Sequence, residues 1–488
     1  MGLHNTDTLN WDTVFALPIS EVNKTIVSQK ASPKKFGCHT TRGSIAGVFE
    51  EWQIIKGGDG SLIHLSIPVN NVTGIYEEDS FSWKRFRMIV EVALNFLPQE
   101  LPAVSSNVYQ LKLKTTSNNP DKPIVSILSI QKEKDLNGNI IKPTGALVDN
   151  EAEEAEVYIK HFMLQWLKNN LKEFNHVFAT VNLNKYISHD SQWAWCKPSY
   201  VDYAYLDSDD EAKKASLLGI LCMTGGRPVT EQQLRQIDPF VIPEKSIAGF
   251  LISEKRILND LVLPTLPLKW KNSSVNDYEV VNSRSADSGQ YQYVLQLKQG
   301  KRIELDKVKD KLGVSHTPYM TKLKIILEAD QVIVETHAET DVGMGITSHC
   351  SATHWYAITL GEKQNGKQTL IFKKAKEPII NQNTEQSNAT KIEEAIIVII
   401  GVIVTAILTV FTSGVVFVVG AIIIGLLTGA AALLPQVIEN LNTATSPDID
   451  LMVYNATSPI KWAGSDVFKL DYAALAGPLQ LGGTPNFH

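Results

Sequence analysis

Phe86–Phe96 has the sequence FRMIVEVALNF, in which large apolar side chains alternate with side chains such as Arg87, Glu91 and Asn95. In an extended strand, successive side chains point to opposite faces of the sheet. The alternation therefore predicts a half-buried strand, with one face in an apolar core and the other in water. Antiparallel sheets commonly have this arrangement.

The same period-two pattern occurs on both sides of this stretch, at Ile63–Ile67, Tyr109–Leu113 and Leu323–Leu327. Asn137-Gly138 and Asn365-Gly366 are residue pairs that favour tight hairpin turns between such strands. The sequence therefore predicts that much of the chain forms antiparallel sheets.

One segment departs from this pattern and predicts a long helix, Glu151–Phe174. Acidic residues begin it and lysines lie near its end, which suits the helix dipole. Its apolar residues recur at helical spacing and predict one buried stripe. The stripe consists of Ala155, Ile159, Phe162, Trp166 and Leu167, and we expect Trp166 to pack on a sheet.

Three features are expected in the second half of the chain. Leu217–Met223 is an apolar run that predicts a buried strand. Ser253 can cap a short helix that runs to about Leu263, with Pro264 just past its end. Glu377–Lys391 is rich in Asn, Gln and Thr, which predicts an exposed linker.

The most unusual stretch is Ala395–Leu434, which contains no charged residue. Thr412-Ser413-Gly414 divides it into pieces of 17 and 20 residues, each long enough for a helix that spans a bilayer. Three interpretations stay open: helices tucked into the fold or an apolar groove, conditional membrane insertion, and a permanent anchor.

Within this stretch, apolar residues repeat at spacings of three and four, so each piece can present one helix face. We expect these faces to bind lipid. The predicted lipid-binding residues are Ile397, Ile400, Val404 and Leu408 in the first piece, and Val416, Val419, Ile423 and Leu427 in the second.

Composition excludes several classes of protein. The 488 residues carry a net charge of -6, and a mildly acidic chain without a dense basic run does not suit nucleic acid. The four cysteines form no C-x-x-C pair, so we expect buried, unreactive thiols. The N-terminus lacks a basic stretch followed by an apolar one, so we expect a soluble protein without a signal peptide.

Catalytic motifs are absent. Gly361–Lys367 has the spacing of a phosphate-binding loop, but Gln368 follows where Ser or Thr would be needed, and strands are predicted on both sides. Gly343–Ser348 lacks the third glycine of a dinucleotide site. No G-x-S-x-G or H-E-x-x-H sequence occurs. We therefore expect no catalytic residues and no enzyme activity.

Potential metal ligands gather at His337, Glu339, His349, Cys350 and His354. The region alternates like a strand, and an odd separation along a strand places two residues on opposite faces. His349 and His354 are separated by an odd number of positions, so they cannot share a face. We therefore expect no metal site and no cofactor.

Several phrases resemble one known family. They are Trp11–Ala16, Trp166–Asn184, Gln236–Pro239, Gly249–Ser253 and Gly477–Gly483. Together they resemble the clostridial P47 proteins, which are encoded beside OrfX-type proteins in some botulinum neurotoxin gene clusters. The resemblance covers most of the chain.

The resemblance implies an α+β fold of the tubular lipid-binding type, in which twisted antiparallel sheets wrap around long helices and leave an apolar groove. It implies two such halves, residues 1–185 and 186–488. The implied function is that of a non-enzymatic accessory component of a bacterial toxin complex, insecticidal in some relatives and released by a non-classical route. The implied partners are lipid or a membrane surface and other proteins of the toxin gene cluster. The alternative is a membrane-inserting component that uses residues 395–434.

Overall fold

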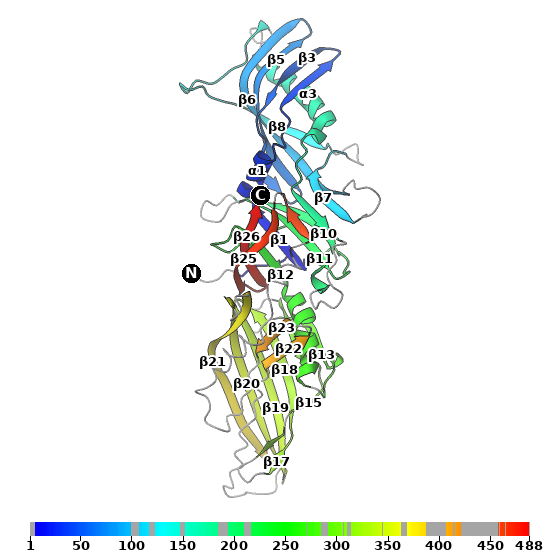
Figure 1. The fold of residues 1–488 in the computed structure, drawn as a ribbon, viewed down its shortest axis with the longest axis vertical. Helices are drawn as coiled ribbons and strands as arrows, with labels where there is room; N and C mark the ends of the chain where they lie inside the picture. The colour runs from blue at the N-terminus through cyan, green and yellow to red at the C-terminus, as the bar shows by residue number, and fades with distance from the viewer. Residues whose placement is uncertain are drawn as a thin grey trace.

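The computed structural model describes residues 5–98, 107–116, 123–146, 152–183, 194–208, 216–270, 272–284, 291–305, 307–309, 314–343, 345–362, 368–386, 407–412, 415–420, 457, 459–463 and 465–487. Figure 1 shows an elongated molecule built mainly of antiparallel strands, with few helices. Among the described residues, no helix is both long and apolar enough to cross a membrane.

One end of the molecule is a nine-stranded sheet with the order β2-β3-β5-β6-β7-β9-β24, in which β4 also pairs with β5 and β8 with β6. Its two longest strands carry the alternating sequences and confirm their predicted form. The strands are β2 (Lys35–Thr40), β3 (Gly43–Phe49), β4 (Gln53–Asp59), β5 (Leu62–Tyr76), β6 (Asp79–Pro98), β7 (Val108–Leu113), β8 (Val125–Lys132), β9 (Ala179–Asn182) and β24 (Ile460–Trp462).

A thirteen-stranded sheet forms the middle and the other end, in the order β10-β11-β1-β12-β26-β25-β20-β19-β18-β14-β13, with β15 on β18 and β21 on β20. Its strands are β1 (Thr13–Pro18), β10 (Pro198–Leu206), β11 (Leu217–Thr224), β12 (Ala248–Ile252), β13 (Tyr278–Arg284), β14 (Tyr291–Leu297), β15 (Ile303–Glu304), β18 (Pro318–Glu328), β19 (Gln331–Gly343), β20 (Ile346–Glu362), β21 (Gln368–Gln386), β25 (Ser465–Leu475) and β26 (Leu479–Phe487). Two short pairs stand apart, β16 (Val308–Lys309) with β17 (Ser315–His316) and β22 (Ile407–Thr412) with β23 (Val415–Gly420).

Each of the two sheets contains a strand that comes from a distant part of the sequence. β1, from the start of the chain, lies between β11 and β12, whereas β24, from near the end, pairs with β9. Tyr203 on β10 also joins the sheets, because its hydroxyl accepts a hydrogen bond from the Leu94 backbone N–H at 2.9 Å and donates to the Ser61 carbonyl at 2.8 Å. The division at residue 185 remains a prediction.

The predicted long helix is confirmed as α3 (Ala152–Asn170), followed by a 3-10 turn at Leu171–Glu173. It packs on β2, β3 and β8, and all five residues of its predicted stripe are buried. Trp166 is 4% exposed, and its ring lies 5.0 Å from that of Phe49 and 6.2 Å from that of Phe36. The predicted apolar stripe of α3 is therefore buried against the sheet, as expected.

The other helices of the described chain are short. They are α1 (Ile19–Ser28), α4 (Glu254–Arg256), a π-helix at Ile257–Val262, 3-10 turns at Leu263–Thr265, Ala194–Cys196 and Val275–Asp277, and α5 (Leu266–Lys269). The helical segment starts after Ser253 as predicted, but the Ser253 side chain makes no capping hydrogen bond. Pro264 lies inside the segment because it occupies the first turn of a new 3-10 piece, where its missing N–H has no cost.

Two predictions of local structure are wrong. The predicted linker at Glu377–Lys391 belongs to β21 up to Gln386, because its backbone pairs with β20 although its sequence is polar. Residues 407–412 and 415–420 form the β22–β23 hairpin where two helices were expected. An apolar run rich in Val and Ile suits either structure, and periodicity alone does not separate them.

Candidate functional site

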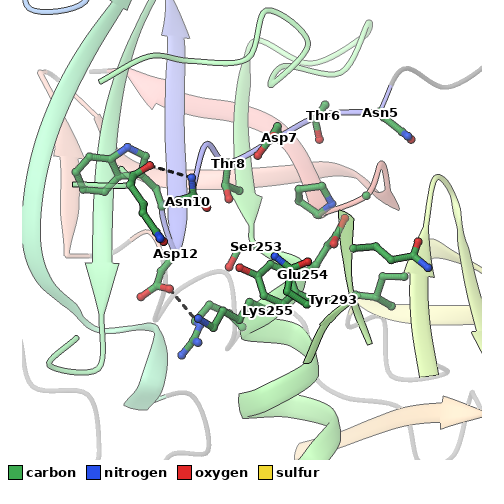
Figure 2. Close-up of a pocket in the computed structure, with 18 of the residues that line it drawn as sticks. Asn5, Thr6, Asp7, Thr8, Asn10, Asp12, Ser253, Glu254, Lys255 and Tyr293 are labelled. Carbon is green, nitrogen blue, oxygen red and sulfur yellow. Dashed lines mark hydrogen bonds and ion pairs between the residues drawn. The ribbon is translucent and has the colours of Figure 1, made fainter. Parts of the chain in front are cut away.

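The N-terminal segment Asn5–Asp12 lies beside the start of α4 and Tyr293 on β14 (Figure 2). Long-range hydrogen bonds hold the segment in this position. The Thr6 backbone N–H donates to the Ala476 carbonyl at 2.7 Å, and the Trp11 indole N–H donates to the Leu234 carbonyl at 2.7 Å. Trp11 is 2% exposed. The buried tryptophan fixes where β1 begins.

A cavity of about 530 Å³ lies beside this segment. Figure 2 shows that its walls come from the N-terminal segment, the start of α4 and Tyr293 on β14. Its lining is mainly polar and combines Asp7, Glu254 and Glu328 with the cations Lys255 and Arg256. Such a cavity suits a polar ligand or a polar segment of another protein, and it does not offer the apolar walls that an acyl chain requires.

Glu254 is the most perturbed acid in this cavity. Burial, together with the negative charges of Asp7 and Glu328, raises the pKa of Glu254 from 4.5 to about 7. A hydrogen bond from the Tyr293 backbone N–H opposes this increase. Glu254 therefore holds a proton in the folded protein at pH values where the unfolded chain has released it.

We expect Glu254→Gln to remove a pH dependence of stability. The raised pKa means that the parent loses stability as pH rises from 4.5 to about 7. At pH 8 the Gln variant should be more stable than the parent by about 2 kcal/mol, since water still reaches part of the carboxylate. At pH 4 the two should be equal. Urea unfolding at both pH values measures this, and a constant difference across pH would contradict it.

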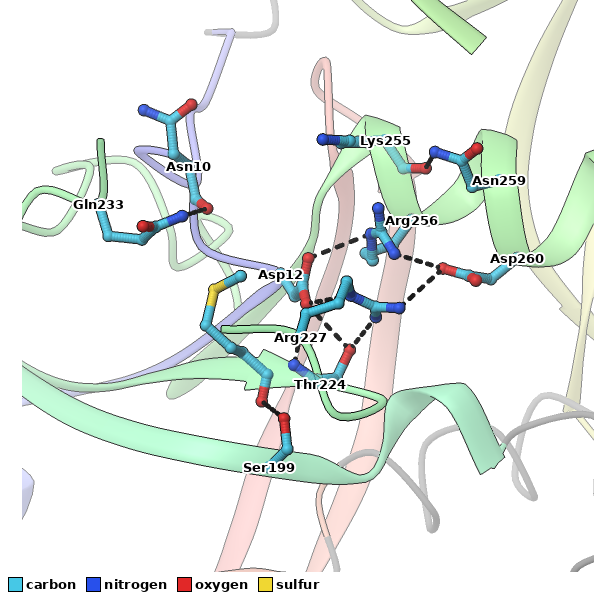
Figure 3. A network of polar contacts seen from close by, with 11 residues as sticks. Asn10, Asp12, Ser199, Thr224, Arg227, Gln233, Lys255, Arg256, Asn259 and Asp260 are labelled. Carbon is cyan, nitrogen blue, oxygen red and sulfur yellow. Dashed lines mark hydrogen bonds and ion pairs between the residues drawn. The ribbon is translucent and has the colours of Figure 1, made fainter. Parts of the chain in front are cut away.

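A network of two acids and two arginines, in which Asp12 and Arg256 are buried and Arg227 and Asp260 are partly exposed, adjoins the cavity (Figure 3). Asp12 is 4% exposed and accepts hydrogen bonds from the Thr224 backbone N–H and Arg227 Nε, both at 2.8 Å. Arg256 Nε lies 3.1 Å from Asp12 Oδ1, and Arg256 Nη1 lies 3.0 Å from Asp260 Oδ2. The network ties β1, the end of β11 and the helical segment together.

The sequence did not indicate this network or the cavity. Asp12 lies inside the phrase Trp11–Ala16, where a single charge among residues destined for the core was the available signal. Glu254 is indistinguishable in sequence from an ordinary acid in the first turn of a helix. Its neighbours Asp7 and Glu328 are brought to it only by the tertiary fold.

Three of the predicted lipid-binding residues lie in the described hairpin. Register pairs Leu408 with Val419 and Phe411 with Val416. Because side chains alternate along strands, positions 408 and 419 share one face, whereas position 416 falls on the other. The register thus separates position 416 from positions 408 and 419, and the lipid-binding role of these residues remains a prediction. Ile397, Ile400, Val404, Ile423 and Leu427 lie outside the described residues.

The hairpin lies against the helical segment and β21. β22 contacts α5 and the 3-10 turn at Leu263–Thr265, and β23 contacts the π-helix and β21. Figure 1 shows β22 and β23 beside this segment. Apolar residues of the segment, such as Leu258, Leu261 and Leu266, are buried. The hairpin thus lies in an apolar part of the fold.

The cysteines and the strands that flank the glycine-rich loop lie as the sequence predicted. All four cysteines are buried, as predicted. Burial raises the pKa of Cys222 to about 12 and that of Cys350 to about 11, so both stay protonated at neutral pH. Gly361 and Gln368 lie on β20 and β21, which pair antiparallel, so strands flank this stretch on both sides as predicted, and residues 363–367 lie outside the described residues.

The sheet faces occupied by His349 and His354 agree with the sequence prediction. His354 is buried on one face of β20, and His349 lies on the other, which confirms the predicted separation. The sequence argument compared residues along one strand only. β19 pairs with β20 in a register that sets Glu339 opposite His349 and His337 opposite Ser351, so ligand-type groups meet across the strands.

Curled antiparallel sheets that exchange strands, with few helices, define the class of this protein. Two solved structures share this fold: P47 from Clostridium botulinum A2, with a TM-score of 0.63 and 18% identity, and P47 of Clostridium botulinum E1, with a TM-score of 0.60 and 17% identity. Each match covers 98% of this chain, and it covers 98% and 99% of the respective P47 chains.

The chain belongs to the OrfX-like family, whose model, described as Protein OrfX2/OrfX3/P47, matches residues 8–483. It is 43% identical to Protein OrfX3 of Paraclostridium bifermentans, over 99% of both chains. It is 39% identical to Protein OrfX3 of Clostridium botulinum (strain Kyoto / Type A2), over 98% of both chains. This confirms the resemblance found in the sequence and places the chain in a family of botulinum neurotoxin-cluster accessory proteins.

Proposed function

We propose that this protein is a non-enzymatic accessory component of a toxin complex that binds lipid through the apolar region around the β22–β23 hairpin. The observation that carries the proposal is the forty-residue stretch without a charge, part of which lies in this hairpin. Uncharged stretches of this length are unusual in a chain in which 20% of all residues are charged.

The register of the hairpin divides its residues between two faces, one of which is the proposed lipid surface. By register, positions 408, 410, 412, 415, 417 and 419 share a face, and all of them are apolar residues except Thr412. The opposite face also carries one threonine, Thr409, which is paired with Val418. The face that contains Leu408 and Val419, two of the predicted lipid-binding residues, is the proposed lipid surface. The tubular lipid-binding architecture implied by the family resemblance would place an apolar groove there.

The free energy gained by burying an acyl chain is large enough to support lipid binding. Burying an acyl chain contributes roughly 0.8 kcal/mol per methylene, so a chain of about sixteen carbons supplies on the order of 12 kcal/mol before ordering costs. A charge placed on the same surface costs several kcal/mol if it stays ionised. A single aspartate on the lipid-binding face is thus expected to abolish binding.

We expect Val419→Asp to lose lipid and Val418→Asp to keep it. The two positions are adjacent and differ in the face that they occupy, so the second variant is a matched control. Each protein is incubated with phospholipid vesicles and repurified, its lipid content is measured by mass spectrometry, and its melting temperature is checked. Equal lipid content in the parent and both variants would contradict the proposal, and so would equal loss in both variants.

Membrane insertion is the second candidate function, and the length of the uncharged stretch favours it as well. The same three proteins distinguish the two functions in a dye-release assay on the vesicles. Lipid binding without insertion predicts no release by the parent. Release that Val419→Asp abolishes would instead support a membrane-inserting component.

We propose that the protein acts by binding and not by catalysis. The described residues that line the polar cavity include neither histidine nor cysteine, which removes the commonest general base and the thiol nucleophile from that cavity. The cavity instead suits contact with a polar segment of a partner protein encoded in the same gene cluster.

A further inference from the structure

We propose that His337, Glu339 and His349 bind one divalent transition-metal ion of the zinc class on the outer face of the β19–β20 pair. This inference does not depend on the proposed lipid function. Ligand atoms of the three residues all lie within 4.8 Å of one another. Within the described part of the chain, they form the one group of this kind.

The strands place the three groups together. His337 and Glu339 are two positions apart on β19, so both point to the same face. Glu339 pairs with His349 across the strands, and His337 pairs with Ser351. The imidazole rings of the two histidines stack with their centroids 5.6 Å apart and their planes at 26°. Backbone hydrogen bonds thus fix the spacing of the ligands.

The distances suit a small ion. His337 Nε2 lies 3.6 Å from Glu339 Oε1, and His349 Nδ1 lies 3.8 Å from the same oxygen. Ligands in a tetrahedral zinc site, with bonds of about 2.0–2.1 Å, are about 3.3 Å apart. The two His–Glu distances exceed this by about half an ångström or less, and all three ligand atoms lie within 4.8 Å of one another. Side-chain rotations that move the atoms by at most about 1.5 Å would therefore bring them to coordination distance.

A hydrogen bond to the second ring nitrogen of His337, Nδ1, can orient the imidazole for metal binding through Nε2. Its Nδ1 lies 2.8 Å from the Ser351 hydroxyl oxygen. If Nδ1 carries the proton and donates to this hydroxyl, the lone pair of Nε2 faces Glu339. A hydrogen bond of this kind fixes the tautomer and orientation of a metal-binding histidine.

An ion can reach the group from solvent. The side chains of His337, His349 and Glu339 are 28%, 17% and 40% exposed. Lys322 lies opposite His337 on the neighbouring strand β18, and its Nζ lies 3.3 Å from Glu335 Oε2, which partly neutralises its charge. Two imidazoles and one carboxylate favour zinc, cobalt or nickel over calcium or magnesium, which prefer oxygen ligands.

The test is a titration of the tag-free full chain with Zn²⁺ by calorimetry and with Co²⁺ by visible absorption. The parent should bind one equivalent of either ion, with Co²⁺ bands typical of few-coordinate sites, and should not bind Mg²⁺. His337→Ala and His349→Ala should lose binding at concentrations that saturate the parent. Ser351→Ala should bind roughly 10–100-fold more weakly, because it removes only the orienting hydrogen bond.

His64→Ala is the matched control, since His64 Nε2 lies 3.3 Å from Glu91 Oε2 in another cross-strand pair that has no second histidine. Its metal binding should equal that of the parent. Zinc should also raise the melting temperature of the parent and of His64→Ala, but not that of His337→Ala. No Zn²⁺ binding by the parent, or undiminished binding by both histidine variants, would overturn the proposal.

Discussion

Replacing Asp12 with alanine is expected to lower the free energy of unfolding by about 3–5 kcal/mol, the usual effect of breaking a buried ion pair from one side. The variant removes the carboxylate that pairs with Arg227 and Arg256 and accepts the Thr224 N–H. Arg256 is 6% exposed and would keep only Asp260 as its counter-charge. Equilibrium unfolding in urea measures the loss.

Burial is the reason for this expectation, and an exposed pair provides the control. Glu50 contacts Arg85 at 3.3 Å, and both side chains are more than two-fifths exposed, at 43% and 42%. Exposed pairs contribute about 0–1 kcal/mol, so Glu50→Ala should change stability by no more than that. An Asp12→Ala loss as small as that of Glu50→Ala would show that the network does not hold β1 in the sheet.

Trp166→Ala is expected to cost about 3–5 kcal/mol, the range for deleting a large aromatic side chain from a core. The indole fills the space between α3 and the sheet and contacts the rings of Phe36 and Phe49. Helix and sheet cannot close this gap without moving the backbone, so a cavity remains.

Val157→Ala is the control on the same helix, because Val157 is 62% exposed. Surface changes of this kind usually alter stability by no more than about 0.5 kcal/mol. Chemical denaturation of both variants compares the two faces of α3 directly. Equal stability of Trp166→Ala and the parent would mean that the stripe does not carry the contact between α3 and the sheet.

Local pattern was enough to predict most of the sheet. The alternation from Phe86 to Phe96 became part of β6, and the run from Leu217 to Met223 became β11, whose residues are all buried. The stripe that contains Trp166 was predictable because a helix on a sheet needs one apolar side. In each case the residue pattern within one segment is enough to predict its structure, whichever segments pack against it.

Pairing partners were not predictable in this way. β21 contains a polar sequence that resembles a linker, and only its register with β20 makes it a strand. The β22–β23 hairpin has an apolar sequence that is equally compatible with a helix. The strand exchange that places β1 beside β11 and β12 depends on contacts between residues about two hundred positions apart.

The candidate sites depend on the same long-range pairing. Glu254 gains its raised pKa from burial and from residues far away in sequence, Asp7 and Glu328. The proposed metal ligands come together because two strands share a register. The spacing of His337 and Glu339 already indicated a shared face, but the third ligand required knowledge of which strand lies alongside.

The central proposal is that this family member binds lipid, and native mass spectrometry tests it most directly. The parent protein is incubated with mixed phospholipid vesicles, repurified without detergent and measured intact, and its lipids are then extracted and identified. The account predicts a bound species heavier than the 54.0 kDa chain by the mass of an acyl lipid, which extraction releases. A single species at the mass of the chain, with no lipid in the extract, would contradict it.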